Sequence, residues 1–154
     1  MQPDLIFSMG PNAFVLLPAR LVQVMRRFTV GEEGRAEAGG ILIGSQRGDH
    51  IEISNCTTPL RRDVRKPYLF DRKDRGHQLA AMSAWTRSLG KRTFVGEWHT
   101  HPEDDPVPSG IDRATWRDIT MKNTAASVFI IFGRKTLWAG IGQAGSVTAM
   151  KVVS

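Results

Sequence analysis

The sequence has one cysteine, Cys56, among its 154 residues, so the chain cannot form an internal disulfide bond. A chain without disulfides suits a reducing compartment, and we expect a cytoplasmic protein. Cys56 ends the alternating stretch HIEISNC, where a small buried apolar side chain is expected; a catalytic thiol is the alternative. The lack of a second cysteine also excludes the zinc deaminases, which need a P-C-x-x-C partner motif.

Long hydrophobic runs are missing as well. The longest, AASVFIIFG, is far shorter than the roughly 20 apolar residues that a membrane-spanning helix needs. The first twelve residues, MQPDLIFSMGPN, have neither the basic region nor the apolar region of a signal peptide. We therefore expect no membrane segment and no export signal.

Several functional motifs are also absent from the sequence. Neither GxxxxGK[S/T] nor GxGxxG leads from a strand into a helix, which argues against nucleotide binding. The H-E-x-x-H motif is missing too, which excludes a zinc protease that carries its ligands on a helix. No repeat, low-complexity segment or long linker interrupts the chain, so we expect residues 1–154 to form a single domain.

The apolar pattern predicts the order strand, helix, two strands, helix, strand, helix and closing strands. This order favours an α+β fold, similar to a three-layer α/β/α arrangement, with a mixed, largely antiparallel sheet flanked by helices. In the second helix, Leu79, Met82, Trp85 and Leu89 share one face. The expected helices are 18–28, 74–89 and 109–122, and the expected strands are 4–9, 39–46, 50–58, 92–101, 126–133, 136–142 and 146–153.

The net charge of +6 is concentrated in residues 61–75, RRDVRKPYLFDRKDR, which hold seven basic and three acidic residues. Such a run could bind nucleic acid or steer an acidic protein partner. A solvent-exposed connection is the interpretation that charge runs usually favour. Within the run, Tyr68, Leu69 and Phe70 predict either a short strand or an apolar anchor for a partner.

Two of the four histidines lie close together in EWHTHPEDDPVPSGID, residues 97–112. His99 and His101 point to the same side of an extended strand, because side chains at i and i+2 share a face. Neutral imidazole is a common ligand for zinc. A histidine pair on an exposed strand face, without metal, is the alternative.

Downstream, Ser109 and Asp112 form an S-x-x-D capping box at the start of a helix. A fixed helix start is also a good place from which to direct Asp112 toward a metal. Two histidines and one carboxylate leave a fourth zinc position for water, as catalytic sites do. A base must then take the proton of that water, and Glu37, before the apolar strand of EAGGILIG, is a candidate. Glu97 shares the face of the histidines and could orient an imidazole instead.

Together, EAGGILIG, GEWHTHP and PSGID resemble the JAB/MPN metallopeptidase family in its zinc-bearing JAMM form. The family pattern is a glutamate before a G-x-L-x-G strand, then H-[ST]-H-P, with seven residues between the second histidine and S-x-x-D. The resemblance implies zinc ligands at His99, His101 and Asp112, a general acid/base at Glu37, and support for the oxyanion or the water at Ser109. It also implies hydrolysis of isopeptide or peptide bonds at the C-terminus of ubiquitin or ubiquitin-like proteins.

The compact length and GEWHTHP resemble bacterial stand-alone members of that family more than eukaryotic proteasome or signalosome subunits. Bacterial anti-phage CBASS operons carry such a peptidase, which removes a nucleotidyltransferase (CD-NTase) from its conjugates. The implied partners are a ubiquitin-like tail or its protein conjugate, including a CD-NTase conjugated by an E1/E2-like enzyme, with no membrane and no nucleic acid. The alternatives are a non-catalytic MPN-type scaffold, which usually lacks ligands that are present here, and a basic nucleic-acid- or protein-binding module.

Overall fold

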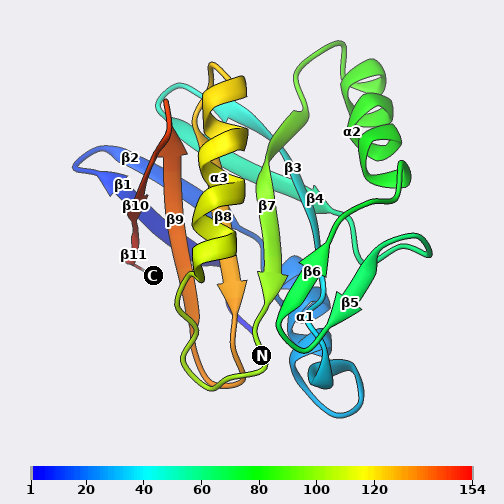
Figure 1. Ribbon diagram of the computed structural model, residues 1–154. Helices are drawn as coiled ribbons and strands as arrows, with labels where there is room; N and C mark the ends of the chain where they lie inside the picture. The colour runs from blue at the N-terminus through cyan, green and yellow to red at the C-terminus, as the bar shows by residue number, and fades with distance from the viewer. Residues whose placement is uncertain (1, 154) are drawn as a thin grey trace.

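The computed structural model describes residues 2–153, which form a mixed nine-stranded sheet with helices on both faces (Figure 1). The strands lie in the order β10-β9-β8-β7-β3-β4-β2-β1-β11, and β5 and β6 form a separate two-stranded hairpin. In chain order the elements are β1 (Leu5–Gly10), β2 (Ala13–Leu17), α1 (Ala19–Arg26), β3 (Gly39–Arg47), β4 (His50–Cys56), β5 (Val64–Lys66), β6 (Leu69–Asp71), α2 (Gly76–Arg87), β7 (Thr93–Thr100), α3 (Gly110–Lys122), β8 (Ser127–Phe132), β9 (Leu137–Gln143), β10 (Ser146–Ala149) and β11 (Lys151–Val152).

The sheet is antiparallel except for two pairs, β2 with β4 and β7 with β8. The second parallel pair is connected through α3, which crosses the sheet between the two strands. This arrangement confirms the predicted mixed, largely antiparallel sheet. None of the helices among residues 2–153 is long and apolar enough to cross a membrane.

Alternation along the strands sorts the apolar side chains into two layers. On one face of the sheet, Leu42 of β3 and Ile130 of β8 join the core that includes α1. On the other face, Ile41 of β3 packs near α2, and Phe129 and Ile131 of β8 pack near α3. The three-layer α/β/α arrangement is therefore confirmed, because successive strand residues face opposite helices.

Helix α2 forms close to the predicted position, but the large side chains of its predicted apolar face point to solvent. Its contacts with the sheet are made by Ala80, Ala81 and Ala84. Small side chains let the helix backbone lie close to β3, so the alanine face wins the contact with the sheet. The larger apolar residues are left on the outside.

Of three further elements, two differ from the sequence-based expectation and one confirms it. Strand β2 follows β1 directly in a hairpin and was not predicted. The run 61–75 folds into the β5–β6 hairpin, so the short-strand interpretation of Leu69 and Phe70 is confirmed. The last predicted strand divides at Met150: β10 pairs with β9, whereas β11 pairs with β1 at the opposite end of the strand order. Only Met150 separates β10 from β11 in the chain, so the sheet must curl to bring its two outer strands near each other.

Candidate metal centre

Strand β7 carries the two histidines in the middle of the sheet. His99 lies near the end of the strand and His101 directly after it, and both side chains are buried. Their Nε2 atoms lie 3.0 Å apart. The structure thus brings the two imidazoles together on one side of the strand.

Asp112 reaches both imidazoles from the first turn of α3. Its Oδ1 lies 3.1 Å from Nε2 of His99, and its Oδ2 lies 3.0 Å from Nε2 of His101. The capping box is present: the Asp112 N–H donates to Ser109 Oγ at 3.0 Å, and the Ser109 N–H donates to Asp112 Oδ2 at 2.9 Å. The cap therefore fixes the carboxylate in the direction of the histidines.

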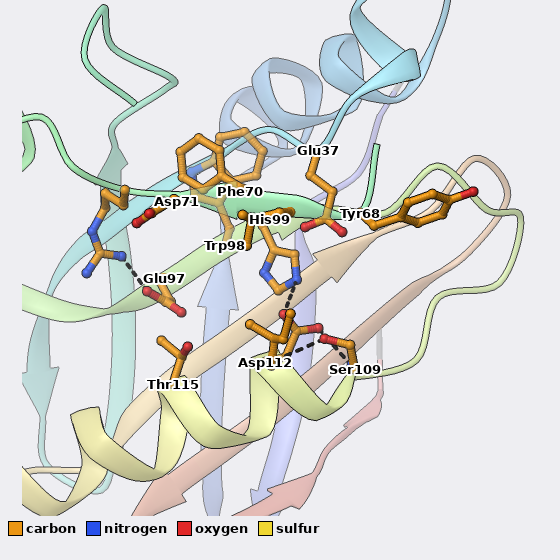
Figure 2. A pocket seen from close by; sticks show the side chains of 13 residues that line it. Glu37, Tyr68, Phe70, Asp71, Glu97, Trp98, His99, Ser109, Asp112 and Thr115 are labelled. Carbon is orange, nitrogen blue, oxygen red and sulfur yellow. Dashed lines mark hydrogen bonds and ion pairs between the residues drawn. The ribbon is translucent and has the colours of Figure 1, made fainter. Parts of the chain in front are cut away.

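Glu37 approaches the same imidazoles from the segment that leads into β3. Its side chain is buried, and its Oε2 lies 3.8 Å from Nε2 of His101. One ligand atom each from Glu37, His99 and His101 lie within 4.8 Å of one another. Figure 2 shows Glu37 and Asp112 on opposite sides of His99.

Burial acts on the two carboxyl groups with different results. Burial raises the pKa of Glu37, and the attraction of the two imidazoles only partly offsets it. Burial also opposes ionisation of Asp112, but hydrogen bonds from His101, His99 and the Ser109 backbone outweigh it and hold the pKa of Asp112 well below its usual range. The pair therefore combines a permanent carboxylate with a carboxyl group suited to exchanging protons.

The donor set matches the requirements of a zinc ion. The two imidazole nitrogens lie 3.0 Å apart, and each is 3.0–3.1 Å from a different oxygen of the Asp112 carboxylate. Zinc bonds of about 2.0–2.2 Å in a tetrahedron place neighbouring ligand atoms about 3.3 Å apart, so a small adjustment is enough. The carboxylate of Asp112 also provides negative charge that a divalent cation would balance.

Arg65 holds the backbone that carries Glu37, a role that the sequence pattern did not reveal. Its Nε donates to the carbonyl of Glu37 at 3.0 Å and its other nitrogens donate to Glu33, while the Glu37 N–H donates to the carbonyl of Lys66 at 2.8 Å. The favoured interpretation of 61–75 as a solvent-exposed connection is therefore wrong for Arg65. In the sequence, Arg65 is one of seven basic residues in this run, and nothing in the pattern distinguishes it from the others.

The acidic, proline-rich loop between His101 and Ser109 is held against the β8–β9 turn. Asp104 accepts a hydrogen bond from Arg134 Nε at 3.0 Å, and its carbonyl accepts from the backbone N–H groups of Lys135 and Thr136. These contacts fix the course of the loop. They therefore help to set the distance between the histidines and the start of α3.

A groove of about 330 Å³ runs beside the cluster, between β6, β7 and the start of α3 (Figure 2). Its lining residues include Tyr68, which is 85% exposed at the turn of the β5–β6 hairpin. The groove residues are Glu37, Tyr68, Leu69, Phe70, Asp71, Arg72, Glu97, Trp98, His99, Ser109, Ile111, Asp112 and Thr115.

Glu97 lies in this groove, but it does not orient an imidazole as expected. Its Oε1 accepts a hydrogen bond from Trp116 Nε1 at 3.0 Å, and its Oε2 pairs with Arg72. The Trp116 ring in turn lies 6.1 Å from the His99 ring, centroid to centroid. Glu97 therefore connects the hairpin to α3 and acts on His99 only through the tryptophan.

Cys56 lies at the end of β4 and is partly buried. Burial raises the pKa of its thiol to about 11. The thiol therefore stays protonated at neutral pH, which agrees with the apolar interpretation and not with a nucleophile.

A mixed sheet between helices, with a histidine pair at the end of an interior strand and carboxylates on either side, defines the JAB class of domain. The chain belongs to the family described as prokaryotic homologs of the JAB domain, which matches residues 18–151. The resemblance seen in the three motifs is thereby confirmed.

Several relatives carry the name CD-NTase/cGAS isopeptidase, and three of them cover most of this chain. The Pseudomonas aeruginosa protein is 40% identical over 82% of this chain and 83% of its own length. The Vibrio cholerae protein is 31% identical over 97% of this chain and 96% of its own length. The Escherichia coli protein is 34% identical over 89% of this chain and 87% of its own length. A solution structure of a Desulfitobacterium hafniense protein shares the fold, with a TM-score of 0.57, 18% identity, and coverage of 84% of this chain and 83% of that one.

Proposed function

We propose that this chain is a JAMM-type zinc isopeptidase that cleaves at the C-terminus of a ubiquitin-like tail. The observation that carries the proposal is the convergence of His99, His101 and Asp112, with Glu37 facing them from the other side. The names of the relatives support a CD-NTase conjugate as the substrate. In such a conjugate, the C-terminus of the CD-NTase would take the place of the ubiquitin-like tail. The E1/E2-like enzyme that would form this conjugate is a further proposed partner, and the setting is CBASS defence in the cytoplasm.

His99, His101 and Asp112 would hold the zinc. When bound, zinc polarises the scissile carbonyl and lowers the pKa of a water molecule. Glu37 accepts the proton of the attacking water and passes it to the leaving amine as the C–N bond breaks. The raised pKa of its buried carboxyl group suits this exchange.

Ser109 supports the carbonyl oxygen in this scheme. Its Oγ already accepts the N–H of Asp112, so the hydroxyl hydrogen is free to donate toward a developing oxyanion. The residue also lines the groove beside the ligands.

The groove accommodates an extended tail. Among residues 2–153, β6 pairs only with β5, so apart from the Phe70 backbone, which contacts the Glu37 carboxyl group, its outer edge offers backbone groups to another strand. A tail of small residues that ends in glycine would pass between this edge and α3. Cleavage is therefore expected directly after the last residue of the tail.

Metal analysis and a defined conjugate test the proposal together. The wild type should carry about one zinc per chain, and it should release a CD-NTase joined through its C-terminus to a lysine of a carrier. Asp112→Ala should lose both zinc and cleavage. Asp118→Ala, an exposed carboxylate on the same helix, is the matched control and should retain both. A metal-free wild type that still cleaves the conjugate would overturn the mechanism.

A further inference from the structure

Helix α2 has two apolar faces, and the face with the smaller side chains is the one that is packed. Ala80, Ala81 and Ala84 lie against Ile41 and Ile43 of the sheet. The opposite face therefore contributes nothing to the core. Figure 1 shows α2 at the periphery of the molecule.

The outward face presents large apolar side chains. Leu79, Met82 and Trp85 are 60%, 56% and 55% exposed, and Leu89, just after the helix, is 90% exposed. Single exposed apolar residues are common, but a contiguous set on one helix face is typical of a binding surface. Tryptophan is also among the residues that contribute most to protein interfaces.

Basic residues flank this face in the chain, and the nearest acidic residue is Asp74, next to Arg75. Residues 75–92 include Arg75, Arg87, Lys91 and Arg92 and contain neither aspartate nor glutamate. Within residues 2–153 the structure shows no ion pair for these four side chains. The matching surface must therefore combine negative charge with an apolar side chain.

Two hollows adjoin the helix and share Thr93. One is lined by Met82, Trp85 and Thr93. The other is lined by Lys91, Arg92 and Thr93 together with Glu52, whose charge is balanced by its ion pair with Arg47. A partner protein could fill the first hollow with a protruding apolar side chain and the second with an acidic side chain beside it. The flat surface of a lipid bilayer would fill neither hollow. A second copy of this chain would bring the same positive charge against itself.

The position of α2 indicates which protein meets it. Arg72 lines the groove, and α2 begins at Gly76, four residues further along the chain. A folded body attached to an extended tail in the groove has to rest on the surface next to the groove. Tyr68 and Ile111 are the exposed apolar residues of the groove itself, and the outward face of α2 follows further along the same segment of chain.

We propose that α2 is a docking surface for the folded protein that carries the scissile tail, whose contact region is acidic around a protruding apolar side chain. The proposal rests on the proposed function, because it assumes a tail in the groove. Docking at α2 would lower the KM for the whole conjugate and leave the chemistry at His99 and His101 unchanged.

Two substrates with the same scissile bond separate docking from chemistry. One is a CD-NTase joined through its C-terminus to a lysine of a fluorescent peptide; the other is its last ten residues joined to that peptide. Met82→Ser/Trp85→Ser and Arg87→Glu/Lys91→Glu should each lower kcat/KM for the whole conjugate about tenfold or more, mainly through KM. Neither variant should change cleavage of the short substrate. Val30→Ser and Lys122→Glu, at exposed positions outside α2, are the matched controls.

Direct binding keeps the test independent of hydrolysis. The Glu37→Gln protein serves as an inactive form, and the α2 substitutions in this form should raise its Kd for the whole conjugate about tenfold. An unchanged Kd, or an equal loss of kcat/KM on the whole conjugate and on the short substrate, would overturn the proposed docking surface. If the α2 variants lose binding to anionic vesicles while conjugate kinetics stay unchanged, α2 would be a membrane-binding surface instead. If they lose a dimer in sedimentation while conjugate kinetics stay unchanged, α2 would be an interface with a second copy of this chain. Failure of the wild type to cleave either substrate would count against the proposed function alone.

Discussion

The hydroxyl of Thr100 accepts a hydrogen bond from the Ala38 N–H at 2.9 Å, and the Thr100 N–H donates to the Ala38 carbonyl at 2.8 Å. Thr100 lies between the two histidines, and Ala38 follows Glu37 directly. This double contact sets the position of Glu37 relative to the imidazoles. It also gives a physical reason for a hydroxyl residue between the histidines.

Thr100→Val should therefore disturb the position of Glu37 without removing any proposed ligand. The change leaves the buried Ala38 N–H without an acceptor, which costs about 1–3 kcal/mol of unfolding free energy. We expect zinc content to remain near that of the wild type and kcat to fall. Thr100→Ser keeps the oxygen and should restore kcat; equal activity of both variants would argue against this role.

Glu37→Gln should retain zinc and lose cleavage by a factor on the order of 10² or more, because glutamine cannot accept the proton of the attacking water. Zinc content by mass spectrometry and single-turnover cleavage measure the two effects separately. If Glu37→Gln stays active while Glu97→Ala abolishes turnover with zinc in place, the assignment of the base is wrong.

Glu97→Ala should weaken the fold near the groove more than it weakens zinc binding. It removes the acceptor of the Trp116 N–H and the partner of Arg72 at once. An unfolding free energy lower by about 1–3 kcal/mol and a raised KM are expected, with zinc retained. Glu97→Gln keeps an acceptor for Trp116 and should lose less stability; an equal loss would place the effect on Arg72 alone.

Asp63 predicts a pH dependence of stability remote from the proposed zinc ligands. Burial raises its pKa, but hydrogen bonds from the Leu60 and Asp74 backbone N–H groups and from His77 outweigh it and hold the pKa below its usual range. The folded state therefore favours the carboxylate. The resulting stability is fully present above the unfolded pKa of about 3.9 and is lost as the pH falls below it.

Asp63→Asn should then lower the unfolding free energy by about 1–3 kcal/mol at pH 7. The difference in unfolding free energy between Asp63→Asn and the wild type should become smaller as the pH falls below about 4. Urea unfolding followed by tryptophan fluorescence, with a chelator in both samples, measures this difference. Asp118→Asn, on the surface of α3, should have the unfolding free energy of the wild type at both pH values. A difference for Asp63→Asn that does not change with pH would contradict the linkage.

The sequence predicted which side chains converge far better than it predicted what supports them. The shared face of His99 and His101 follows from strand alternation and the Ser109–Asp112 cap from helix capping, which depend on neighbours a few residues apart; the expectation that the two meet came from the family resemblance. The contacts of Arg65 with the Glu37 segment span about 30 residues of chain and depend on how the β5–β6 hairpin folds back. Local patterns carry no information on that fold-back.

The orientation of α2 shows a second limit. Helical periodicity identifies apolar positions, but it does not say which of two apolar faces meets the sheet. In α2 the choice depends on how closely the helix backbone can lie against Ile41 and Ile43, and alanine permits the closer contact. Residue size opposite the sheet decided the outcome, and hydrophobicity alone did not reveal it.

The division of the last strand at Met150 also affects how the protein behaves among other proteins. The outermost strands, β10 and β11, have only four and two residues, so the main sheet presents little unpaired backbone to a neighbouring molecule. Short outer strands of this kind protect against edge-to-edge aggregation. If the proposed tail pairs with β6, the short outer strands of the main sheet keep that sheet from competing for the same kind of contact.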